Sequence, residues 1–310
     1  MEIIMCNIAV IITGGTIAST KKENYISLNG DKYKIIELFK EKNPDAAFWI
    51  SFDTFNPYTI LSENLSGKYI NTLIKCAREI LNDSKKYDGI IITHGTDTLQ
   101  YSSAALALAL SDVKIPVVFV SANYILDDER SNGLINFTQA VEYISSYDMT
   151  GVYVSYDGSV LDGFTLLPHM PYSDKIYALN HSDKLSEESS AREFLMYEGI
   201  TFDNALLTDI APVLYLKAVP GQTYPSFNDT DIKAILLETY HSGTLGTDSK
   251  LFHRFCKAAY DKNIPVYAVG VESRTQYEST ASYDQLHLTV MHKISPIAAY
   301  MYLWFKYSKK

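Results

Sequence analysis

Two short polar turns rich in threonine and glycine follow apolar runs of the sequence. TGGT occupies residues 13–16, after the run 7–12, and HGTDT occupies residues 94–98, after the run 90–93. A threonine hydroxyl is a weak nucleophile at neutral pH and needs a neighbouring base. Glycines let backbone N–H groups approach a ligand closely, where they can stabilise an oxyanion. The TGGT turn and the HGTDT turn together therefore have suitable groups for acyl transfer from an amide.

Each turn alone also has a structural explanation. The TGGT turn could be only a tight connection between a strand and a helix. Thr96 or Thr98 could cap the helix that follows the HGTDT turn, because threonine is a good N-cap residue. Neither turn matches GxGxxG or the phosphate loop with its Gly-Lys pair, so nucleotide binding has weak support.

The runs before the two turns indicate the elements that position them. Residues 7–12 form a continuous run rich in β-branched side chains, which is typical of a strand buried on both faces. We expect further strands at 90–93, 117–121 and 152–156, and helices at 66–82, from about 102, and at 132–146. This alternation predicts an α/β fold with a mainly parallel, doubly wound sheet. Such sheets bind ligands at the carboxyl ends of their strands, where both turns fall.

The chain is predicted to contain two α/β domains of unequal size. Residues 180–206 are polar and show little strand pattern, so we expect a linker at 183–206 between a larger N-terminal domain (1–182) and a smaller C-terminal domain (207–310). In the second domain we expect strands at 213–217, 234–239 and 265–270, a helix at 249–261, and a last helix with Ser295 as N-cap and Pro296 as its first residue.

The composition limits the kinds of molecule that the protein is expected to bind. The 310 residues carry a net charge of -9 and no basic block, which argues against nucleic acid or an anionic membrane as the main partner. The three cysteines, Cys6, Cys76 and Cys256, form no CxxC pair and indicate reduced thiols in a cytoplasmic protein. The apolar N-terminal run lacks a basic start and leads into the TGGT turn, so we interpret it as a strand and not a signal peptide. No apolar run is long enough to span a bilayer.

The two turns also carry a resemblance to a known family. TGGTIAS at 13–19 and THGTDTL at 93–99 resemble the L-asparaginase family in its bacterial and archaeal two-domain asparaginase/glutaminase form. ILSENL at 60–65, SAN at 121–123, VLDG at 160–163 and SPIAAY at 295–300 extend the resemblance along the chain. It implies an amidohydrolase that converts L-asparagine to L-aspartate and ammonia through a threonine nucleophile and an acyl-enzyme. It further implies a homodimer or homotetramer that needs no cofactor.

The resemblance assigns catalytic roles to three residues. Thr16, the second threonine of TGGT, would be the nucleophile. Tyr25, in a segment soon after it, would help to activate the Thr16 hydroxyl, although one tyrosine among 24 in a polar segment is unremarkable in itself. Thr96 would be the second catalytic hydroxyl.

Three further residues would bind the substrate. Ser62 and Glu63 would hold the α-carboxylate and the amino group, although Glu63 could equally be a solvated surface acid. Asp97 would bind the substrate ammonium and belong to a Thr–Lys–Asp relay. A buried carboxylate is tolerable only with a partner, and the ammonium would be one.

The sequence departs from the family pattern where the relay lysine is expected. Aligned without gaps, that position is Pro168, and the nearest ionisable candidates are His169 and Lys175. A lysine in a desolvated site can act as a base, a histidine can do so near neutral pH, and a proline can do neither. Either Lys175 reaches the site, or the relay is altered, or catalysis is weak.

These departures leave other functions open. A related amidase could act on a different amide, and a catalytically weak homologue could only bind an amino acid. A transamidation subunit acting on glutamyl-tRNA is less expected, because the sequence has no basic signal for tRNA.

The C-terminal domain departs from the family too. Thr244 stands where an asparagine-containing turn is common, and Glu278 is kept in a region that can contribute to ammonium binding across an interface. His241 and His253 have no partner at metal-ligand spacing, so we expect them to be structural and the protein to have no metal site.

Overall fold

The computed structural model describes residues 5–23, 25–28, 30–83, 85–147, 149–179, 190–227, 231–271 and 277–308. The chain divides into two compact units, Met1–Asn204 and Ala205–Lys310. The division lies inside the segment predicted as a linker. Part of that segment, 183–189, lies outside the described residues, but Ser190–Glu198 forms helix α6, which packs on helix α4 (Leu99–Ala109) of the first unit. That stretch therefore belongs to the first unit.

The first unit is built on a six-stranded sheet with the order β4-β1-β5-β6-β7-β8. Its strands are β1 (Cys6–Ile12), β4 (Ile50–Phe55), β5 (Gly89–Thr93), β6 (Pro116–Val120), β7 (Gly151–Tyr156) and β8 (Ser159–Asp162). All neighbours pair in parallel except β8, which pairs antiparallel with β7. Every residue of β5, β6 and β7 is buried, as expected for a mainly parallel sheet covered on both faces.

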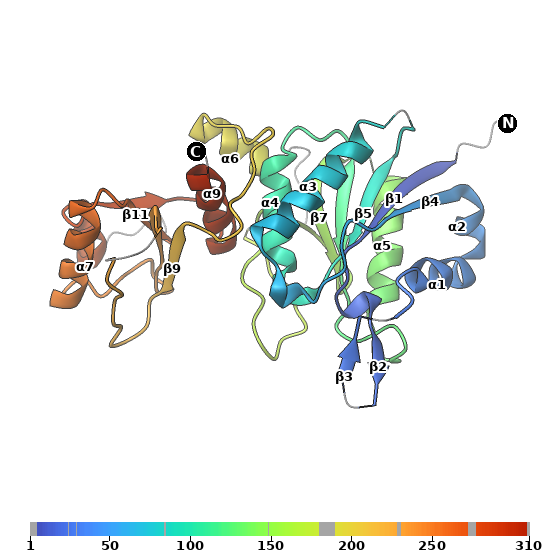
Figure 1. The fold of residues 1–310 in the computed structure, drawn as a ribbon, viewed down its shortest axis with the longest axis horizontal. Helices are drawn as coiled ribbons and strands as arrows, with labels where there is room; N and C mark the ends of the chain where they lie inside the picture. The colour runs from blue at the N-terminus through green and yellow to red at the C-terminus, as the bar shows by residue number, and fades with distance from the viewer. Residues whose placement is uncertain are drawn as a thin grey trace. The chain divides into compact units, whose positions relative to one another are not determined.

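Helices cover the sheet in two packed pairs (Figure 1). Helix α1 (Lys34–Lys42) packs on α5 (Gly133–Ser146), and α3 (Gly67–Leu81) packs on α4. Short helix α2 (Pro44–Trp49) follows α1 and leads into β4. Helix α4 is buried along almost its whole length, which explains its Ala- and Leu-rich sequence without a polar stripe.

Small elements lie around the ends of the strands. A hairpin of β2 (Thr20–Lys22) and β3 (Tyr25–Ser27) extends away from the remainder of the first unit in Figure 1. Three single turns of 3₁₀ helix follow the apolar runs: η1 (Thr16–Ala18), η2 (Ser62–Asn64) and η3 (Thr96–Thr98). These three turns contain most of the residues to which the sequence assigned chemistry.

The second unit is a smaller α/β unit with a four-stranded parallel sheet, ordered β12-β11-β10-β9. Its strands are β9 (Val213–Lys217), β10 (Ala234–Glu238), β11 (Val266–Val269) and β12 (Leu288–Met291), and its helices are α7 (Lys250–Asp261), α8 (Glu278–Ala281) and α9 (Pro296–Ser308). The Ser295 hydroxyl accepts a hydrogen bond from the Ala298 N–H at 3.1 Å, as predicted for the N-cap of α9.

The predicted α/β fold is confirmed, and the predicted strands and helices are present with boundaries that differ by a few residues. The sequence did not predict β4, the β2–β3 hairpin, β12, or the helices α1, α2, α6 and α8. Among the described residues, the helices are all too short or too polar to cross a bilayer.

Candidate active site

Three segments that are far apart in the sequence meet at the carboxyl edge of the first sheet. Strand β1 pairs with β5 up to Ile12 and Thr93, so the TGGT turn and the HGTDT turn start side by side. The Thr13 hydroxyl donates to the Thr93 carbonyl at 2.8 Å. On the other side of the TGGT turn, Gly14 pairs with Ile60, the first residue of the ILSEN segment (60–64).

The glycines are required by this close approach. A Cβ atom on Gly15 would lie 2.3 Å from the Gly95 Cα, and one on Gly14 would lie 2.4 Å from the Ile60 carbonyl oxygen. A Cβ on Gly95 would lie 2.5 Å from the Ser62 Cβ. Gly14 and Gly15 also have φ values of 110° and 76°, which disfavour other residues. The backbones of all three segments are therefore in direct contact.

The Thr96 hydroxyl is held by the end of β6. It lies 2.8 Å from the Ser121 hydroxyl and donates to the Ala122 carbonyl at 3.1 Å. Since Thr96 has only one hydroxyl proton, Ser121 is the donor in the first bond. The Thr98 hydroxyl donates to the Ser62 carbonyl at 2.9 Å. Thr98 does occupy the N-cap position of α4, but neither hydroxyl makes the capping bond that the structural explanation requires. Both instead connect the HGTDT turn to neighbouring segments.

Thr16 lies just before the β2–β3 hairpin, and Tyr25 begins the second strand of that hairpin. Thr16 is half-buried at the start of η1 and directly follows the Gly15 contact. Tyr25 begins β3, pairs with Lys22, and is 62% exposed. The structure therefore places Thr16 at the meeting point of the three segments, and Tyr25 on an exposed hairpin connected to it.

The predicted substrate-binding residues differ in exposure. Ser62 is buried against Gly95, whereas the neighbouring Glu63 is exposed. The Asp97 side chain is also exposed, and its backbone carbonyl accepts a hydrogen bond from the Gln100 amide. The carboxylates of Glu63 and Asp97 are therefore both exposed to solvent, where each can bind a cation.

His94 is buried and has a defined tautomer. Its Nδ1–H donates to the Gly95 carbonyl at 2.8 Å, and its Nε2 accepts from the Ser102 hydroxyl at 2.9 Å. Burial lowers the pKa of His94 to about 4, while the bond to Gly95 acts in the opposite direction. The imidazole is therefore neutral near pH 7, where it ties the HGTDT turn to α4.

Asn136 on α5 joins the ends of β6 and β7. This fully buried side chain donates to the Ser121 carbonyl at 2.8 Å and accepts from the Asp157 N–H at 2.9 Å. The Ser155 hydroxyl donates to the Asn136 carbonyl at 2.8 Å. Because Ser121 also donates to Thr96, Asn136 supports the residue that holds the Thr96 hydroxyl.

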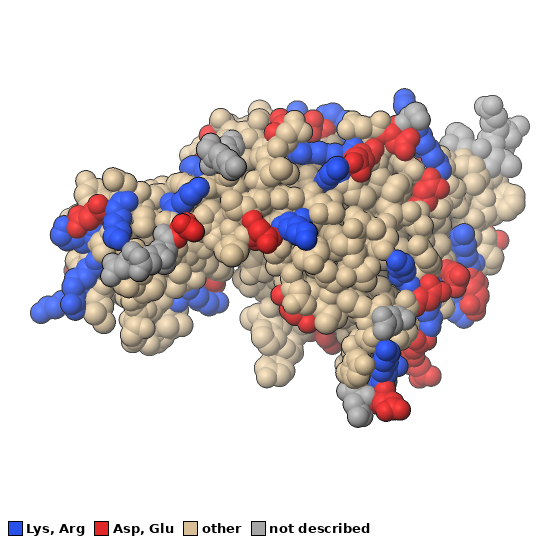
Figure 2. Space-filling view, viewed as in Figure 1, with Lys and Arg blue, Asp and Glu red and all other residues tan. Residues whose placement is uncertain are grey.

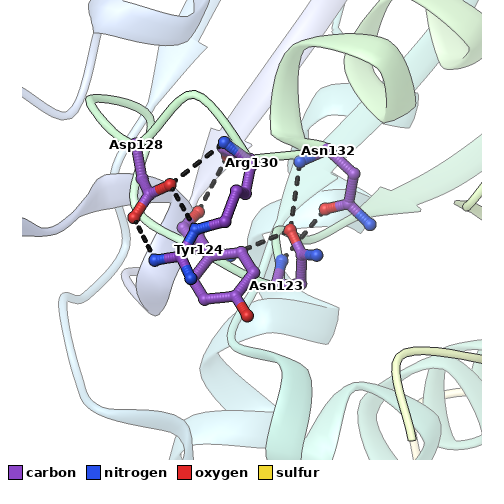
Figure 3. Close-up of polar contacts among 6 residues, drawn as sticks. Asn123, Tyr124, Asp128, Arg130 and Asn132 are labelled. Atoms are coloured by element: carbon purple, nitrogen blue, oxygen red, sulfur yellow. Dashed lines mark hydrogen bonds and ion pairs between the residues drawn. The ribbon is translucent and has the colours of Figure 1, made fainter.

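The loop after β6 is closed by two asparagines (Figure 3). The Asn123 N–H donates to the Asn132 Oδ1 at 2.9 Å, and the Asn132 N–H donates to the Asn123 Oδ1 at 3.0 Å. This reciprocal pair keeps the two ends of the loop together, directly beyond the Ala122 carbonyl that accepts from Thr96.

The outer part of the same loop carries a charged cluster. The Arg130 guanidinium makes two hydrogen bonds to the Asp128 carboxylate, at 2.9 and 2.7 Å, and its Cζ lies 4.1 Å from the centroid of the Tyr124 ring (Figure 3). Its hydrogen bonds hold the pKa of the Asp128 carboxyl well below its usual range. The Lys34 ammonium on α1 binds Asp127, which fixes the loop to the body of the first unit.

The region of the missing relay lysine presents no amine to Thr96. Pro168 is half-buried, and the Lys175 side chain is exposed. Within the described ranges, the hydrogen bonds of the Thr96 hydroxyl go to Ser121 and Ala122, and none is made with Lys175. The His169 Nε2–H donates to the Ser173 carbonyl at 2.8 Å. The His169 ring packs at 72° against the Tyr156 ring, with centroids 6.3 Å apart.

The residues of the second unit to which the sequence drew attention differ in burial and in their hydrogen bonds. Thr244 is half-buried, and its carbonyl accepts from the Tyr240 N–H at 3.0 Å. Glu278 is exposed at the start of α8. The His253 Nε2–H donates to the Thr247 carbonyl at 2.7 Å, in keeping with a structural role, and His241 is exposed.

A cavity of about 600 Å³ lies at the opposite edge of the first sheet, where α3 and α4 end and β5 and β6 begin. It is therefore remote from the three joined segments. In the part of the chain that the structure describes, the His, Cys, Asp and Glu side chains form no group of three or more that could hold a metal ion.

The fold and the site together define a mixed α/β protein with joined polar turns at the carboxyl edge of a parallel sheet. The family model for the N-terminal part of asparaginases matches residues 7–167. The chain belongs to the asparaginase family.

Its relatives include proteins with different names. It is 35% identical to a glutamyl-tRNA(Gln) amidotransferase subunit of Methanobrevibacter smithii over 162 residues, which are 52% of this chain and 36% of that protein. It is 25% identical to L-asparaginase 1 of Escherichia coli K12 over 269 residues, 84% of this chain and 78% of that protein. The chain thus matches little more than a third of the length of the first of these relatives.

Solved structures share the fold over nearly the whole chain. L-asparaginase I from Vibrio cholerae matches with a TM-score of 0.73 at 19% identity, covering 99% of this chain and 94% of that one. The L-asparaginase from Thermococcus kodakarensis matches with a TM-score of 0.69 at 20% identity, covering 98% and 93%. At these identities the likeness concerns the fold alone.

Sequence reasoning missed four residues that organise this edge of the sheet: His94, Ser121, Asn136 and Tyr156. His94 and Ser121 were part of recognised motifs, but nothing in the motifs indicated that His94 bonds to Ser102 or that the Ser121 hydroxyl holds Thr96. Asn136 lies in a helix and Tyr156 at the end of an apolar run, where a polar side chain carries no local signal of its partner.

Proposed function

We propose that the protein is an amidohydrolase that hydrolyses L-asparagine, or a closely similar amino-acid amide, to the acid and ammonia. The observation that carries the proposal is the backbone contact of Gly15 with Gly95, which joins the TGGT turn to the HGTDT turn. This contact supports the proposal because the two turns carry Thr16, Thr96 and Asp97 and lie at the edge where parallel α/β sheets bind ligands.

In the proposed reaction the Thr16 hydroxyl attacks the amide carbon of the substrate. The carbonyl oxygen takes the electron pair, and backbone N–H groups of the glycine-rich turns are the available donors to the resulting oxyanion. The C–N bond then breaks, the nitrogen leaves as ammonia after gaining a proton, and Thr16 is left as an ester. Water attacks this acyl-enzyme, and the acid product leaves while Thr16 regains its proton.

The other predicted residues have supporting roles in this proposal. Tyr25 would help to activate Thr16 when the hairpin closes on the substrate, and Thr96 would act as the second hydroxyl. Asp97 and Glu63, both exposed, would bind the substrate ammonium, and Ser62 would bind its carboxylate.

The quaternary structure is part of the proposal. A homodimer or homotetramer would act without a cofactor. Light scattering coupled to size-exclusion chromatography measures the assembly, and a monomeric active protein would contradict this part.

A second candidate differs in the fate of the ammonia. The 35% identity to a glutamyl-tRNA(Gln) amidotransferase subunit over half of the chain favours a role in which the released ammonia is passed on to a transamidation partner. Acidic and basic side chains are interspersed on the face seen in Figure 2, and the net charge is -9, so a polyanion such as tRNA would have to be bound by that partner. Both candidates share the amide hydrolysis step.

The test is ammonia release from L-asparagine, D-asparagine, L-glutamine and an asparagine-containing dipeptide. Thr16→Ala is expected to abolish turnover, and Thr16→Ser, which keeps a hydroxyl, to retain part of it. Thr72→Ala is the matched control, because the exposed Thr72 hydroxyl donates to the Lys68 carbonyl of its own helix, and its loss should leave turnover unchanged.

The outcomes separate the candidates. Turnover of L-asparagine that disappears in Thr16→Ala supports the asparaginase. Turnover of L-glutamine alone favours the ammonia-supplying role. A folded protein that binds L-asparagine without releasing ammonia is the catalytically weak homologue, and the hydrolase proposal then fails.

A further inference from the structure

Tyr156 is a buried residue at the end of β7. The side chain is 2% exposed, and its hydroxyl oxygen has no hydrogen-bond partner among the residues that the structure describes. Burying a hydroxyl without a partner is unfavourable, and such groups are rare in folded proteins. This one therefore calls for a physical explanation.

The backbone of Tyr156 lies beside the candidate active site. The preceding residue, Ser155, pairs with Val120 in the parallel ladder, so Tyr156 is opposite Ser121, whose hydroxyl holds Thr96. The following residue, Asp157, is joined to the Ser121 carbonyl through the side chain of Asn136. Tyr156 is thus fixed from both sides at the carboxyl edge of the sheet.

The side chain of Tyr156 is surrounded by two loops. His169, whose ring is fixed by its bond to Ser173, packs against the Tyr156 ring from the loop that lacks the relay lysine. Asn132, from the loop after β6, is also near the phenol, and its Oδ1 accepts from Asn123, next to the Ala122 carbonyl that accepts from Thr96. The ring is therefore well packed, and only its oxygen is left without a partner.

The Tyr156 hydroxyl can act only as a neutral group near pH 7. Burial raises the pKa of Tyr156, and Asp174 and Asp157 raise it further. Asn132 acts in the opposite direction, although the phenol oxygen and the Asn132 amide do not meet hydrogen-bond geometry. A neutral phenol that no protein acceptor engages is a hydrogen-bond donor available to a ligand.

We propose that the Tyr156 hydroxyl donates a hydrogen bond to an acceptor oxygen, carbonyl or carboxylate, of the amide bound at the carboxyl edge of the first sheet. This inference rests on the proposed function. It explains why an unsatisfied hydroxyl is kept in an otherwise packed position, since binding groups are often retained at the expense of stability. The proposal also gives a role to the loop that has Pro168 in place of the relay lysine, because His169 in this loop packs against the Tyr156 ring and orients it.

Tyr156→Phe tests the proposal, with Tyr143→Phe as the matched control. The Tyr143 hydroxyl on α5 is also buried without a partner within the described part of the chain, but it lies in the last turn of the helix, away from the carboxyl edge. Each variant loses one buried hydroxyl oxygen that has no hydrogen-bond partner among the residues that the structure describes. We expect both to keep or raise the urea midpoint of unfolding. Tyr156→Phe should lower kcat/KM for the amide at least tenfold, and Tyr143→Phe should leave it unchanged.

Thermal shift with L-asparagine and L-aspartate separates this inference from the proposed function. Wild-type turnover that is unchanged in Tyr156→Phe overturns the inference and leaves the function standing. A Tyr156→Phe variant that loses both stability and turnover also overturns it, because the hydroxyl would then be structural. If the wild type releases no ammonia, the function fails. The inference is then supported if the amino acids raise the wild-type melting temperature and not that of Tyr156→Phe, and overturned if they raise neither or both.

Discussion

Replacing Gly15 by alanine tests whether the contact between the TGGT turn and the HGTDT turn positions Thr16. The new Cβ would meet the Gly95 Cα at 2.3 Å and the Gly95 nitrogen at 2.4 Å, whereas ordinary contacts begin at 3.4 Å. These are backbone atoms, so no flexible side chain can give way. The two turns must therefore separate by about 1 Å, and Thr16 moves with them.

The size of the effect has two parts. With φ 76° and ψ -176°, Gly15 lies in a region populated essentially by glycine alone, which costs an alanine about 1–3 kcal/mol, and overpacking adds about 1–3 kcal/mol. Gly15→Ala should therefore lower the free energy of unfolding by roughly 2–6 kcal/mol. Misplacing a reacting group by about 1 Å can lower a rate by about 100-fold, so kcat/KM should fall on that order.

Gly158→Ala measures the cost of a positive φ without overpacking. Gly158 also has a φ of 76°, but a Cβ there would have no atom within 4 Å. It should lose only about 1–2 kcal/mol and keep wild-type turnover. Urea unfolding measures the stability of both variants, and ammonia release measures their activity under conditions where each is folded. The reasoning is refuted if Gly15→Ala keeps wild-type turnover, or if its stability loss equals that of Gly158→Ala.

Three further predictions concern the groups around the site. Burial lowers the pKa of His94 to about 4, so the unfolded chain takes up a proton before the folded protein does as the pH falls below about 6.5. The free energy of unfolding should therefore drop by about 3 kcal/mol by pH 4. Urea unfolding of His94→Gln should show a shallower decline with pH, and an equal decline would contradict the argument. Asn136→Ala leaves the buried Ser121 carbonyl and the part-buried Asp157 N–H without their partner, so it should cost roughly 1–3 kcal/mol for the carbonyl and a smaller amount for the N–H. Asn136→Asp should cost at least as much by the same measurement, because its carboxylate would be buried opposite the Ser121 carbonyl, and an unchanged urea midpoint in either variant would contradict the role of Asn136. Asp128→Asn should lower the urea midpoint slightly at pH 7 and less at pH 3. The stability contributed by the Asp128 carboxylate, which is paired with Arg130, is complete above the unfolded pKa of about 4 and is lost as the pH falls below it. A difference between variant and wild type that does not depend on pH would argue against the pairing.

The sequence predicted the central strands well because their signal is local. Strands β1, β5 and β6 are continuous apolar runs rich in β-branched residues, and their burial on both faces makes that composition necessary. Strand β4 was missed because it lies at an edge of the sheet, where most of its residues are only partly buried and the pattern ISFDTF alternates weakly. The hairpin carrying Tyr25 was missed for a similar reason, since it is short, polar and mostly exposed.

The segment predicted as a linker contains a helix that its sequence did not indicate. Its polar composition hides helix α6, which has only two buried residues, Ala191 and Leu195. Such a helix is stabilised mainly by packing on α4 and not by its own pattern.

The sequence by itself determined which chemical groups this protein has and where each is placed along its strands. The threonine turns, their glycines and the absence of a lysine at position 168 can all be read from the residues, because turn chemistry and strand runs depend on near neighbours. Only the tertiary structure decided which of these groups meet. The contact of Gly15 with Gly95, the bonds of Thr96 to Ser121 and Ala122, and the unused hydroxyl of Tyr156 depend on the parallel register of strands far apart in the chain. That register is set by the packing of the whole sheet and its helices, which no local pattern specifies.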